Sequence, residues 1–578
     1  MTSPNAKMQR SKHTSASQTL FAPLKNSTFR RIWLATQMSS LGSLMQTVAI
    51  GWLMTTISRS DLLVALVQAS STLPVFVLSL FAGPIADSFD RRMVMLTSLC
   101  VMALATATIT VLIALGFTNP WLILGFSFLV GCGSALYNPA WQASVGDIVD
   151  REDLPAAVTL GSVGFNTIRS VGPALGGVIV AAFGPLAAFV LNTLSYLVPL
   201  DATRRCRWDV RRSPLPRESM ATSIYDGLRF TVMSAEIKAA IARGTLFGLA
   251  SISILALLPL IVRDRLAQGP VAYGVLMGGF GVGAFLGGVS SGILRRALSQ
   301  ERLVTLACLA CAACCILLAI GPSLRVAAVG LALGGAGWVI AWSGFGVIVQ
   351  LASPRWIVGR TLSIYYALTY GGIAAGSWVW GAAAEKYSLT TSLIGSSGAL
   401  VLVAFAGIVF PIREHREADH EEPEELNAPA INAKLMPRNG PIVVKTDYLI
   451  AEQHINSFLA IMHERRRMRS RVGARNWTLA RDIHQPERWT ESFRTPTWAD
   501  YLRLHHRLPR EDKELDGRLL ELHKGERPIE MKFAIERPTS AAPTTEQLAV
   551  FSPPADLVTG SSMRVSGRKA KAEKDKET

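Results

Sequence analysis

The stretch that decides the fold is Gly83-Pro-Ile-Ala-Asp87-Ser-Phe-Asp90-Arg91-Arg92, which separates two long apolar runs. Those runs, residues 62–82 and 93–115, contain no charged side chain. An apolar run of about 18 or more residues is long enough to cross a bilayer as a helix. Gly83 suits a tight turn, and Asp87 lies at a helix end, where it can pair with Arg91 and face the positive N-terminus of another helix. We therefore predict two membrane helices joined by a gating loop, with Gly83, Asp87, Asp90, Arg91 and Arg92 as its functional residues. A turn at the membrane edge whose arginines only set the topology is the alternative.

The same apolar pattern recurs along residues 1–411 and sets the fold class. Half of the chain (50%) is hydrophobic, 17% is charged and the mean hydropathy is +0.31. A soluble protein of this size is less apolar, because a core needs only one apolar face of each helix. We predict an all-α polytopic membrane protein with twelve transmembrane helices. Their predicted ranges are Ile32–Thr56, Leu62–Ala82, Met93–Leu115, Trp121–Trp141, Ala156–Phe183, Pro185–Leu200, Ile241–Val262, Ala272–Leu294, Leu303–Gly321, Val326–Leu351, Thr361–Ala384 and Leu389–Phe410.

The net charge of +16 belongs to the membrane part of the chain. Residues 1–411 carry 29 Lys and Arg against 15 Asp and Glu, whereas residues 412–578 carry 29 against 27. Basic residues mark the cytoplasmic loops of membrane proteins, so no nucleic-acid partner is implied. With a cytoplasmic N-terminus, 22 Lys and Arg fall on the inner side and 5 on the outer side. We therefore expect both termini to be cytoplasmic.

A long basic break after the sixth span divides the membrane part into two six-helix lobes. Weak repeats relate the lobes at an offset of about 200–205 residues, as in the pairs Gly83 and Gly288, and Gly172 and Gly372. Two parallel repeats with a site between them at mid-membrane are the layout of a secondary transporter. The expected domains are a basic cytoplasmic N-terminus (1–31), an N-terminal lobe (32–200), a cytoplasmic linker (201–240), a C-terminal lobe (241–410), an acidic linker (411–440), a small folded domain (441–538) and a disordered tail (539–578).

The fifth span contains a proline flanked by glycines and one buried charge. Pro173 removes a backbone hydrogen bond and kinks the helix, while Gly172, Gly176 and Gly177 let neighbouring helices approach closely. An ordinary small-residue helix contact is the alternative. Arg169 is the only charged side chain well inside a span, where a charge is expensive. It either contacts an anionic substrate or a gating network, or it binds the backbone carbonyls that Pro173 frees.

Neutral polar and aromatic side chains in the spans are candidates for a substrate cavity. Besides Arg169 they are Asn166, Gln37, Gln46, Trp338, Trp342, Tyr366 and Tyr370. No Asp or Glu lies in the middle of a span, so the only candidates for proton coupling stand at helix ends. These are Asp87, Asp147, Asp201 and Glu385. The partners that we expect are the lipid bilayer, a small-molecule cargo and a proton as coupling ion, with no metal and no cofactor.

The segment after residue 440 has the pattern of a small α+β domain. Val444, Thr446 and Tyr448 alternate as in a strand, and Ile455, Phe458, Leu459 and Met462 follow helical spacing. The later alternations and stripes extend this to the order βαββαβ, the ferredoxin-like arrangement. Six histidines in this part match no zinc spacing. Dimerisation of the chain through this domain stays an open alternative.

These motifs are specific enough to support a resemblance to known proteins. The 83–92 loop resembles the signature loop of the major facilitator superfamily, G-x-x-x-D-x-x-x-R-[RK], and Gly172-Pro173 resembles the core of its antiporter motif, which favours export. Residues 20–411 resemble the bacterial branch that contains the enterobactin exporter, and the C-terminal domain resembles antibiotic-biosynthesis monooxygenases. The resemblance implies a multi-pass permease of the bacterial inner membrane that exports a siderophore or a drug by alternating access, and not an enzyme. An importer of the same fold, or a membrane-tethered enzyme with a catalytic C-terminal domain, stays open.

Overall fold

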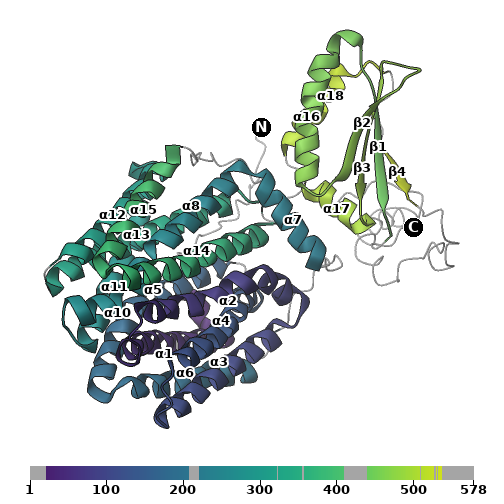
Figure 1. The fold of residues 1–578 in the computed structure, drawn as a ribbon. Helices are drawn as coiled ribbons and strands as arrows, with labels where there is room; N and C mark the ends of the chain where they lie inside the picture. The colour runs from purple at the N-terminus through teal and green to yellow at the C-terminus, as the bar shows by residue number, and fades with distance from the viewer. Residues whose placement is uncertain are drawn as a thin grey trace, which may run out of the picture. The chain divides into compact units, whose positions relative to one another are not determined.

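The computed structural model describes residues 21–150, 152–206, 208, 220–321, 323–354, 357–408, 439–507, 510–525, 529 and 531–536. They form two compact units (Figure 1). One, the helical unit, contains the described residues up to 408. The other, the sheet unit, contains those from 439 to 536. Each unit is described by itself below.

The helical unit is built from long helices with short connections. Before the break these are η1 (Ala22–Lys25), α1 (Ser27–Ile57), α2 (Asp61–Ser88), α3 (Arg91–Ala114), α4 (Pro120–Ile148), α5 (Leu154–Phe183) and α6 (Pro185–Arg205). After it come α7 (Met220–Met233), α8 (Ala235–Ser251), α9 (Ser253–Ala256), α10 (Leu258–Leu260), η2 (Ile261–Arg265), α11 (Pro270–Ala297), α12 (Gln300–Ile320), α13 (Leu324–Leu351), α14 (Val358–Lys386), α15 (Leu389–Phe405) and η3 (Ala406–Ile408).

Each of the twelve predicted spans falls on a helix or, for residues 241–262, on the continuous run α8 to η2. Among the described residues, eight of these segments are long and apolar enough to cross a membrane. The other four are α1, α5, α14 and α15. The first three are long but rich in Gly, Ser, Thr and Gln, and α15 has only 17 residues. A twelve-span count therefore stays a prediction. Helix α7 lies in the break, where the sequence analysis placed only a linker.

Polar residues fix the starts of several helices. The Asn26 side chain accepts hydrogen bonds from the backbone N–H groups of Thr28 and Phe29, and Asp90 accepts one from Arg92 N. Such caps satisfy the backbone donors that a helix leaves free at its N-terminus. Inside the helices, hydroxyl groups bond back to the preceding turn, as Thr106 Oγ1 does to Met102 O at 2.7 Å. These hydroxyl groups are thus satisfied without water.

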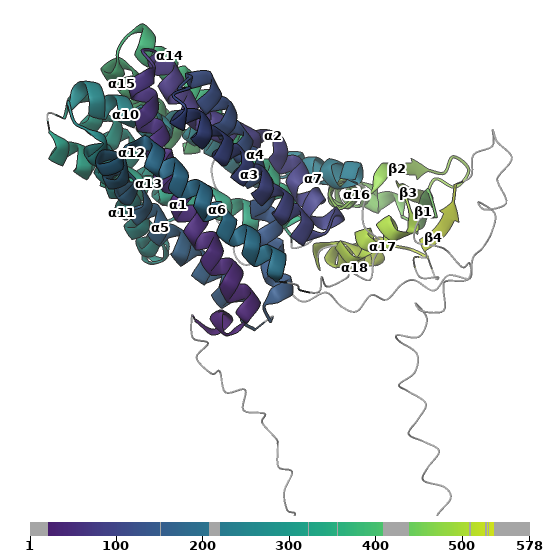
Figure 2. The ribbon, with the colours of Figure 1, turned by 90° about the horizontal axis from the view of Figure 1, so that it is seen from below.

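The helices pack as two blocks that face each other. In the first block α1 packs on α5 and α6, and α4 packs on α2 and α3. In the second block α13 packs on α11 and α12, α12 on α15, and α8 on α14. The two largest contacts between the blocks are those of α2 with α14 and of α5 with α11 (Figures 1 and 2). These two pairs are the surfaces that must slide or part if the blocks move.

The sheet unit is a four-stranded antiparallel sheet in the order β2-β3-β1-β4. Its elements are β1 (Ile442–Leu449), η4 (Glu452–His454), α16 (Ile455–Arg471), β2 (Arg475–Arg481), β3 (Arg488–Thr495), α17 (Trp498–Arg507), α18 (Arg510–Leu522) and β4 (Met531–Ile535). They coincide with the predicted strands and helical stripes. Along β1 the side chains alternate between buried and more exposed, so one face of the sheet forms a core with α16 and α18.

Candidate functional site

The loop between α2 and α3 ties the first block together at one end. Arg91 Nη1 donates to Asp147 Oδ2 at 2.6 Å and to Ala143 O at 3.1 Å, both on α4. Arg92 donates to the last turn of α6, at Thr203 O and Arg204 O. A guanidinium at a helix C-terminus satisfies carbonyls that lack an intrahelical partner. Asp90 begins α3. The turn predicted at Gly83 is wrong, because α2 continues through this residue to Ser88 and the chain turns at Phe89 and Asp90. The side chain of Asp87 lies outside what the structure describes, so the pairing predicted for it stays a prediction.

The glycines of α5 face two different neighbours. A methyl group added at Gly172 would stand 3.0 Å from Leu44 Cβ, and one at Gly176 would stand 2.8 Å from Met45 Cα, so these glycines bring α5 against α1. A methyl group at Gly177 would stand 2.7 Å from the Cα of Gly274 on α11. Only glycine fits so close an approach of two backbones. The motif therefore packs helices within the first block and, at Gly177, between the blocks.

Polar contacts join the blocks at the end of the helical unit that holds Asp61, Arg263 and Glu385, called here the contact end. The Glu385 carboxylate of α14 accepts from Ser60 Oγ at 2.5 Å and from Leu62 N at 3.0 Å, at the N-terminus of α2. Arg263 donates to Thr55 O of α1 at 2.6 Å and stands 3.8 Å from Asp61. A carboxylate at a helix N-terminus and an arginine on a C-terminal carbonyl are both favourable placements.

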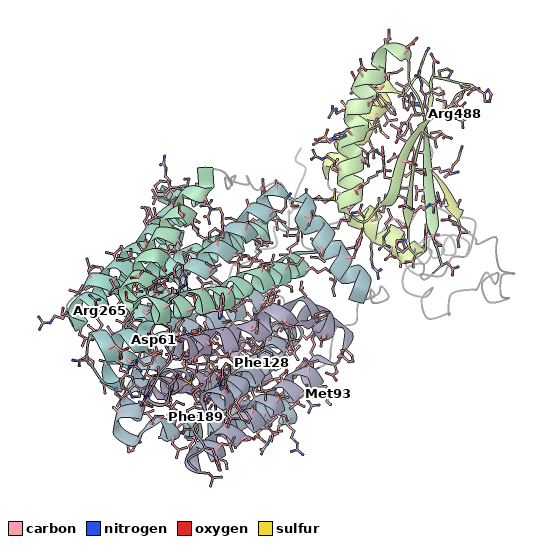
Figure 3. The ribbon with its side chains drawn as sticks, viewed as in Figure 1. Asp61, Met93, Phe128, Phe189, Arg265 and Arg488 are labelled. Atoms are coloured by element: carbon pink, nitrogen blue, oxygen red, sulfur yellow. The ribbon has the colours of Figure 1, made fainter. Side chains whose placement is uncertain are left out.

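The contact end lies opposite the Arg91 loop. Asp61 and Arg265 lie toward one end of the helical unit, and Met93, two residues after Arg91, lies toward the other (Figure 3). Helix α11 shows what changes between the two ends. Methyl groups at Gly274 and Gly281 would collide with the backbone of α5, whereas one at Gly292 would meet nothing within 4 Å. All three glycines lie on one helix face, because they are separated by whole turns. The described part of α11 is thus in tight contact with α5 near the contact end and not at Gly292.

Five of the predicted cavity residues gather around one aromatic cluster. Trp338 and Trp342 of α13 stack with ring centroids 6.2 Å apart, and Trp342 meets Tyr370 of α14 edge-on at 5.7 Å. Tyr366 adjoins Tyr370 at 6.4 Å. The fifth residue is Arg169, which approaches the cluster from α5 across the two blocks through Phe280.

The other predicted cavity residues lie elsewhere. Gln46 accepts a hydrogen bond from the side chain of Asn192 on α6, and both are buried within the first block. Gln37 lies beside Gly164 of α5, and its Oε1 atom is buried with no hydrogen-bond partner among the described residues. The side chain of Asn166 lies outside what the structure describes.

Several functional candidates were missed by sequence reasoning. Asp61, Arg263 and Ser60 at the contact end, and Phe280 in the aromatic cluster, carry no motif of their own. Glu385 was noted only as a charge at a helix end. Its partner Ser60 is 325 residues away along the chain, and no local pattern marks such a pair. A search for charged residues at the ends of both lobes on the predicted outer side is the one signal that points to them.

The sheet unit holds a buried ionic cluster rather than an open site. The Glu491 carboxylate, 0% exposed, accepts from Tyr448 OH at 2.9 Å, Trp477 Nε1 at 2.7 Å, Arg469 Nη1 at 3.0 Å and Arg465 Nε at 3.2 Å. Burial raises the pKa of this carboxyl, but the two arginines and the other donors outweigh it and hold the pKa below its ordinary value. In the part of the chain that the structure covers, no three His, Cys, Asp or Glu side chains come close enough together to hold a metal ion.

Two known proteins illustrate what the sequence is similar to. YfiS of Bacillus subtilis, an uncharacterized MFS-type transporter, is 30% identical over 34% of this chain and 48% of its own length. The multidrug efflux pump Tap of Mycolicibacterium fortuitum is 23% identical over 63% of this chain and 91% of its own. The chain thus spans about half of the first relative and most of the second.

The fold is that of solved transporters. The crystal structure of a POT family transporter in complex with a thioalcohol-conjugated peptide superposes with a TM-score of 0.55, at 12% identity, over 66% of this chain and 96% of that one. At this identity the likeness concerns the fold alone. The family described as "Transmembrane secretion effector" matches residues 18–539, which include both units. The chain therefore belongs to the transmembrane secretion effector family, and is a membrane transporter of the major facilitator superfamily.

Proposed function

We propose that this chain is an efflux permease that moves a small organic molecule, a siderophore or a drug, out across the bacterial inner membrane by alternating access. The observation that carries the proposal is the asymmetric contact between the two blocks. Polar bonds and backbone contacts join them at the contact end, and Gly292 meets open space farther along α11. The name of Tap, a multidrug efflux pump, supports the direction of transport.

The charge distribution assigns the two ends of the helical unit to the two sides of the membrane. The Arg91 loop belongs to the basic, cytoplasmic side under the positive-inside rule, and the contact end then faces outward. With twelve spans and both termini cytoplasmic, the described state is open to the cytoplasm. Cargo enters there and leaves after the contacts of Glu385 and Arg263 break and α5 parts from α11.

The predicted residues take three roles in this cycle. Gly83, Asp87, Asp90, Arg91 and Arg92 form the cytoplasmic gate, whose ion pair between Arg91 and Asp147 holds α3 to α4. Gly172, Pro173, Gly176 and Gly177 form the packing surface on which α5 moves. The aromatic cluster with Arg169 contacts the cargo, and a proton is the coupling ion. No acid among the described residues stands at mid-span, so the coupling carboxyl is sought at helix ends, with Glu385 and Asp147 as candidates.

The sheet unit has the strand order and connections of a ferredoxin-like domain, and we assign it to that class as part of this proposal. Its interior is filled by the Glu491 cluster and by aromatic rings, which supports a binding or dimerising role. The enterobactin-exporter-like branch stays the branch that the sequence resembles. The family match across both units supports a joint function for them.

The test is cargo accumulation in cells with and without the protein. Fluorescent drugs and native siderophores are measured inside cells that express the unchanged chain, Asp87→Asn or the control Asp153→Asn. Asp153 precedes α5 and makes no side-chain cap bond, so its variant has the same chemical change without the gate. We expect lower cell content with the unchanged chain and the control, and not with Asp87→Asn. Higher content with the unchanged chain would replace the exporter by an importer.

A further inference from the structure

Arg169 is a charge without a counter-charge. Among the described residues its guanidinium makes no ion pair and no hydrogen bond, and it lies over the face of Phe280, 5.8 Å from the ring centroid. Two other arginines of the helical unit are compensated. Arg243 is 0% exposed and donates to Glu301 at 2.7 Å, and Arg91 bonds Asp147. A charge at the middle of a membrane helix is costly, so a charge without a partner needs a reason.

The structure does not support the alternative role of Arg169, in which its side chain binds the backbone carbonyls that Pro173 frees. Pro173 frees the carbonyl four residues before it, which is the backbone carbonyl of Arg169 itself. Gly281 of α11 packs directly on that carbonyl: a methyl group there would stand 2.6 Å from Arg169 O. In the described part of the chain the guanidinium donates to no backbone carbonyl. The side chain is therefore not needed to satisfy the kink.

Aromatic side chains lie around the guanidinium group of Arg169. Phe280 meets Trp338 at 6.0 Å, Trp338 stacks on Trp342, and Trp342 meets Tyr370, which lies near enough to Arg169 to interact with it electrostatically. The cluster is not closed. Trp342 and Arg169 are half-buried, and Tyr366 at its edge is 39% exposed. Rings in this arrangement offer flat faces and edges on which another aromatic ring packs.

The combination selects among chemical classes of cargo. A positive charge in a region of low dielectric repels a cation and attracts an anion, and no described acid stands near enough to pair with Arg169. A neutral cargo would leave the guanidinium as it is. A carboxylate, phosphate or sulfonate accepts two parallel hydrogen bonds from a guanidinium. Of these classes, only an anionic cargo recovers the cost of a charge within a membrane helix.

We propose that the cargo site takes an aromatic organic anion, with its acidic group on Arg169 and its ring against Trp342 and Tyr370. This inference rests on the proposed transport function and adds the chemical class of the cargo. The proposal excludes lipophilic cations, which are the probes that one would first choose for a drug exporter. Arg169 sets the preference for an anion. The aromatic cluster contributes affinity for the ring of the cargo, and this part of the affinity does not depend on the charge of the cargo.

The test compares matched probes that differ only in charge. The full chain in lipid nanodiscs is titrated with 1-pyrenebutyrate, with the neutral 1-pyrenebutanol and with the cationic 1-pyrenebutylammonium. Binding is followed by energy transfer from tryptophan to pyrene, and empty nanodiscs correct for partition into lipid. The variants are Arg169→Gln, Arg169→Lys and the control Arg265→Gln. Arg265 donates to Thr390 at the contact end, so its variant removes the same charge away from the cluster.

We expect the unchanged chain to bind 1-pyrenebutyrate at least about tenfold more tightly than 1-pyrenebutanol, since a hydrogen bond to a charged group contributes about 1.5–3 kcal/mol. Arg169→Gln should abolish the difference, Arg169→Lys should keep part of it, and Arg265→Gln should leave it unchanged. Equal affinities in the unchanged chain, a preference that survives in Arg169→Gln, or tightest binding of the cation would each overturn the proposal.

The result is separable from the proposed function and from misfolding. Arg169→Lys and a melting curve of each variant show whether lost binding comes from lost charge or lost fold. If the anion binds through Arg169 and the cell content of 1-pyrenebutyrate does not fall, export is wrong and the cargo class stands. If the unchanged chain exports both probes equally well, and Arg169→Gln exports 1-pyrenebutyrate as well as the unchanged chain does, the cargo class is wrong and export stands.

Discussion

Replacing Gly274 by alanine tests whether the contact of α5 with α11 is one state of a moving interface. The added methyl group would stand 2.5 Å from Gly177 Cα and 2.8 Å from Pro173 O. Carbon atoms pack best at about 3.5–4.0 Å, and these neighbours are backbone atoms that cannot rotate away. The helices must therefore separate by about 1 Å in the described state. Overpacking of this kind costs about 1–3 kcal/mol.

The cost falls on the described state alone, because a state with α5 and α11 apart has no such overlap. A bias of about 1–3 kcal/mol changes the ratio of the two states by about 5- to 150-fold. The matched control is Gly292→Ala. Gly292 lies on the same face of the same helix, and an added methyl group there meets nothing within 4 Å. Both variants gain the same helix propensity, so that effect cancels.

Spin-label distances measure the shift. In a cysteine-free chain, one pair of labels joins Phe183 of α5 to Val271 of α11 near the contact end. A second pair joins Val158 to Ile293 on the same helices. All four side chains are well exposed, so labels attach without repacking. Gly274→Ala should lengthen the first distance in part of the population, and Gly292→Ala should not. If the two folded variants give the same distances as the unchanged chain, the interface does not move and the reasoning is refuted.

Three further expectations concern single ionic contacts. Glu491→Gln removes the buried carboxylate that Arg465 and Arg469 share, while Arg465 keeps its pair with Asp516, and the loss should destabilise the sheet unit by about 3–5 kcal/mol. Glu464→Gln removes only an exposed pair, and hydrogen exchange of β1 read by mass spectrometry separates the two variants. Burial raises the pKa of Asp447, but hydrogen bonds from Thr490, Arg488 and Lys532 outweigh burial and lower this pKa to about 2. The stability that the Asp447 carboxylate contributes is therefore present above its ordinary pKa of 3.8 and is lost as the pH falls toward 2. Exchange rates of β1 should show that loss, and Asp447→Asn should not. Glu385→Ala removes the acceptor for Ser60 and Leu62 and should lengthen the label distance at the contact end in part of the population, while Lys386→Ala should leave it unchanged.

The sequence predicts the helices well because their signal is local. An apolar run reports its own burial in lipid, and each of the twelve runs falls on helical structure. The strands of the sheet unit follow for the same reason, since the alternation at Val444, Thr446 and Tyr448 reports one buried face. Helix α7 was missed because its pattern is amphipathic and short. Phe230 is buried and Val232 is 62% exposed, so the segment looks like a polar linker to a search for apolar runs.

The site was harder to predict because it depends on contacts between distant segments. Gln46 and Arg169 look alike in sequence, as polar residues in apolar helices. In the structure Gln46 bonds Asn192 within its own block, and Arg169 crosses to Phe280 of the other. Nothing within a few residues of either position distinguishes these outcomes. Spacing identifies the residues that are unusual for a membrane, and only the packing of α5 on α11 decides which of them meet.

The glycines of α11 make a last prediction about the state that is not described. The backbone of α5 packs directly against Gly274 and Gly281 of α11. The same face of α11 continues to Gly292, where an added methyl group would meet nothing within 4 Å. A glycine inside a helix lowers the stability of the helix by about 1 kcal/mol relative to alanine. At Gly292 no contact of the described state offsets this loss. We expect α5 to close on Gly292 when it leaves Gly274. Gly292→Leu should then shorten neither label distance in the described state, yet it should stop transport by blocking the other state. Gly292→Ala should shift the population toward the described state, opposite in sign to Gly274→Ala. Equal transport by Gly292→Leu and the unchanged chain would show that the face serves only one contact, and that the blocks alternate without rocking along α11.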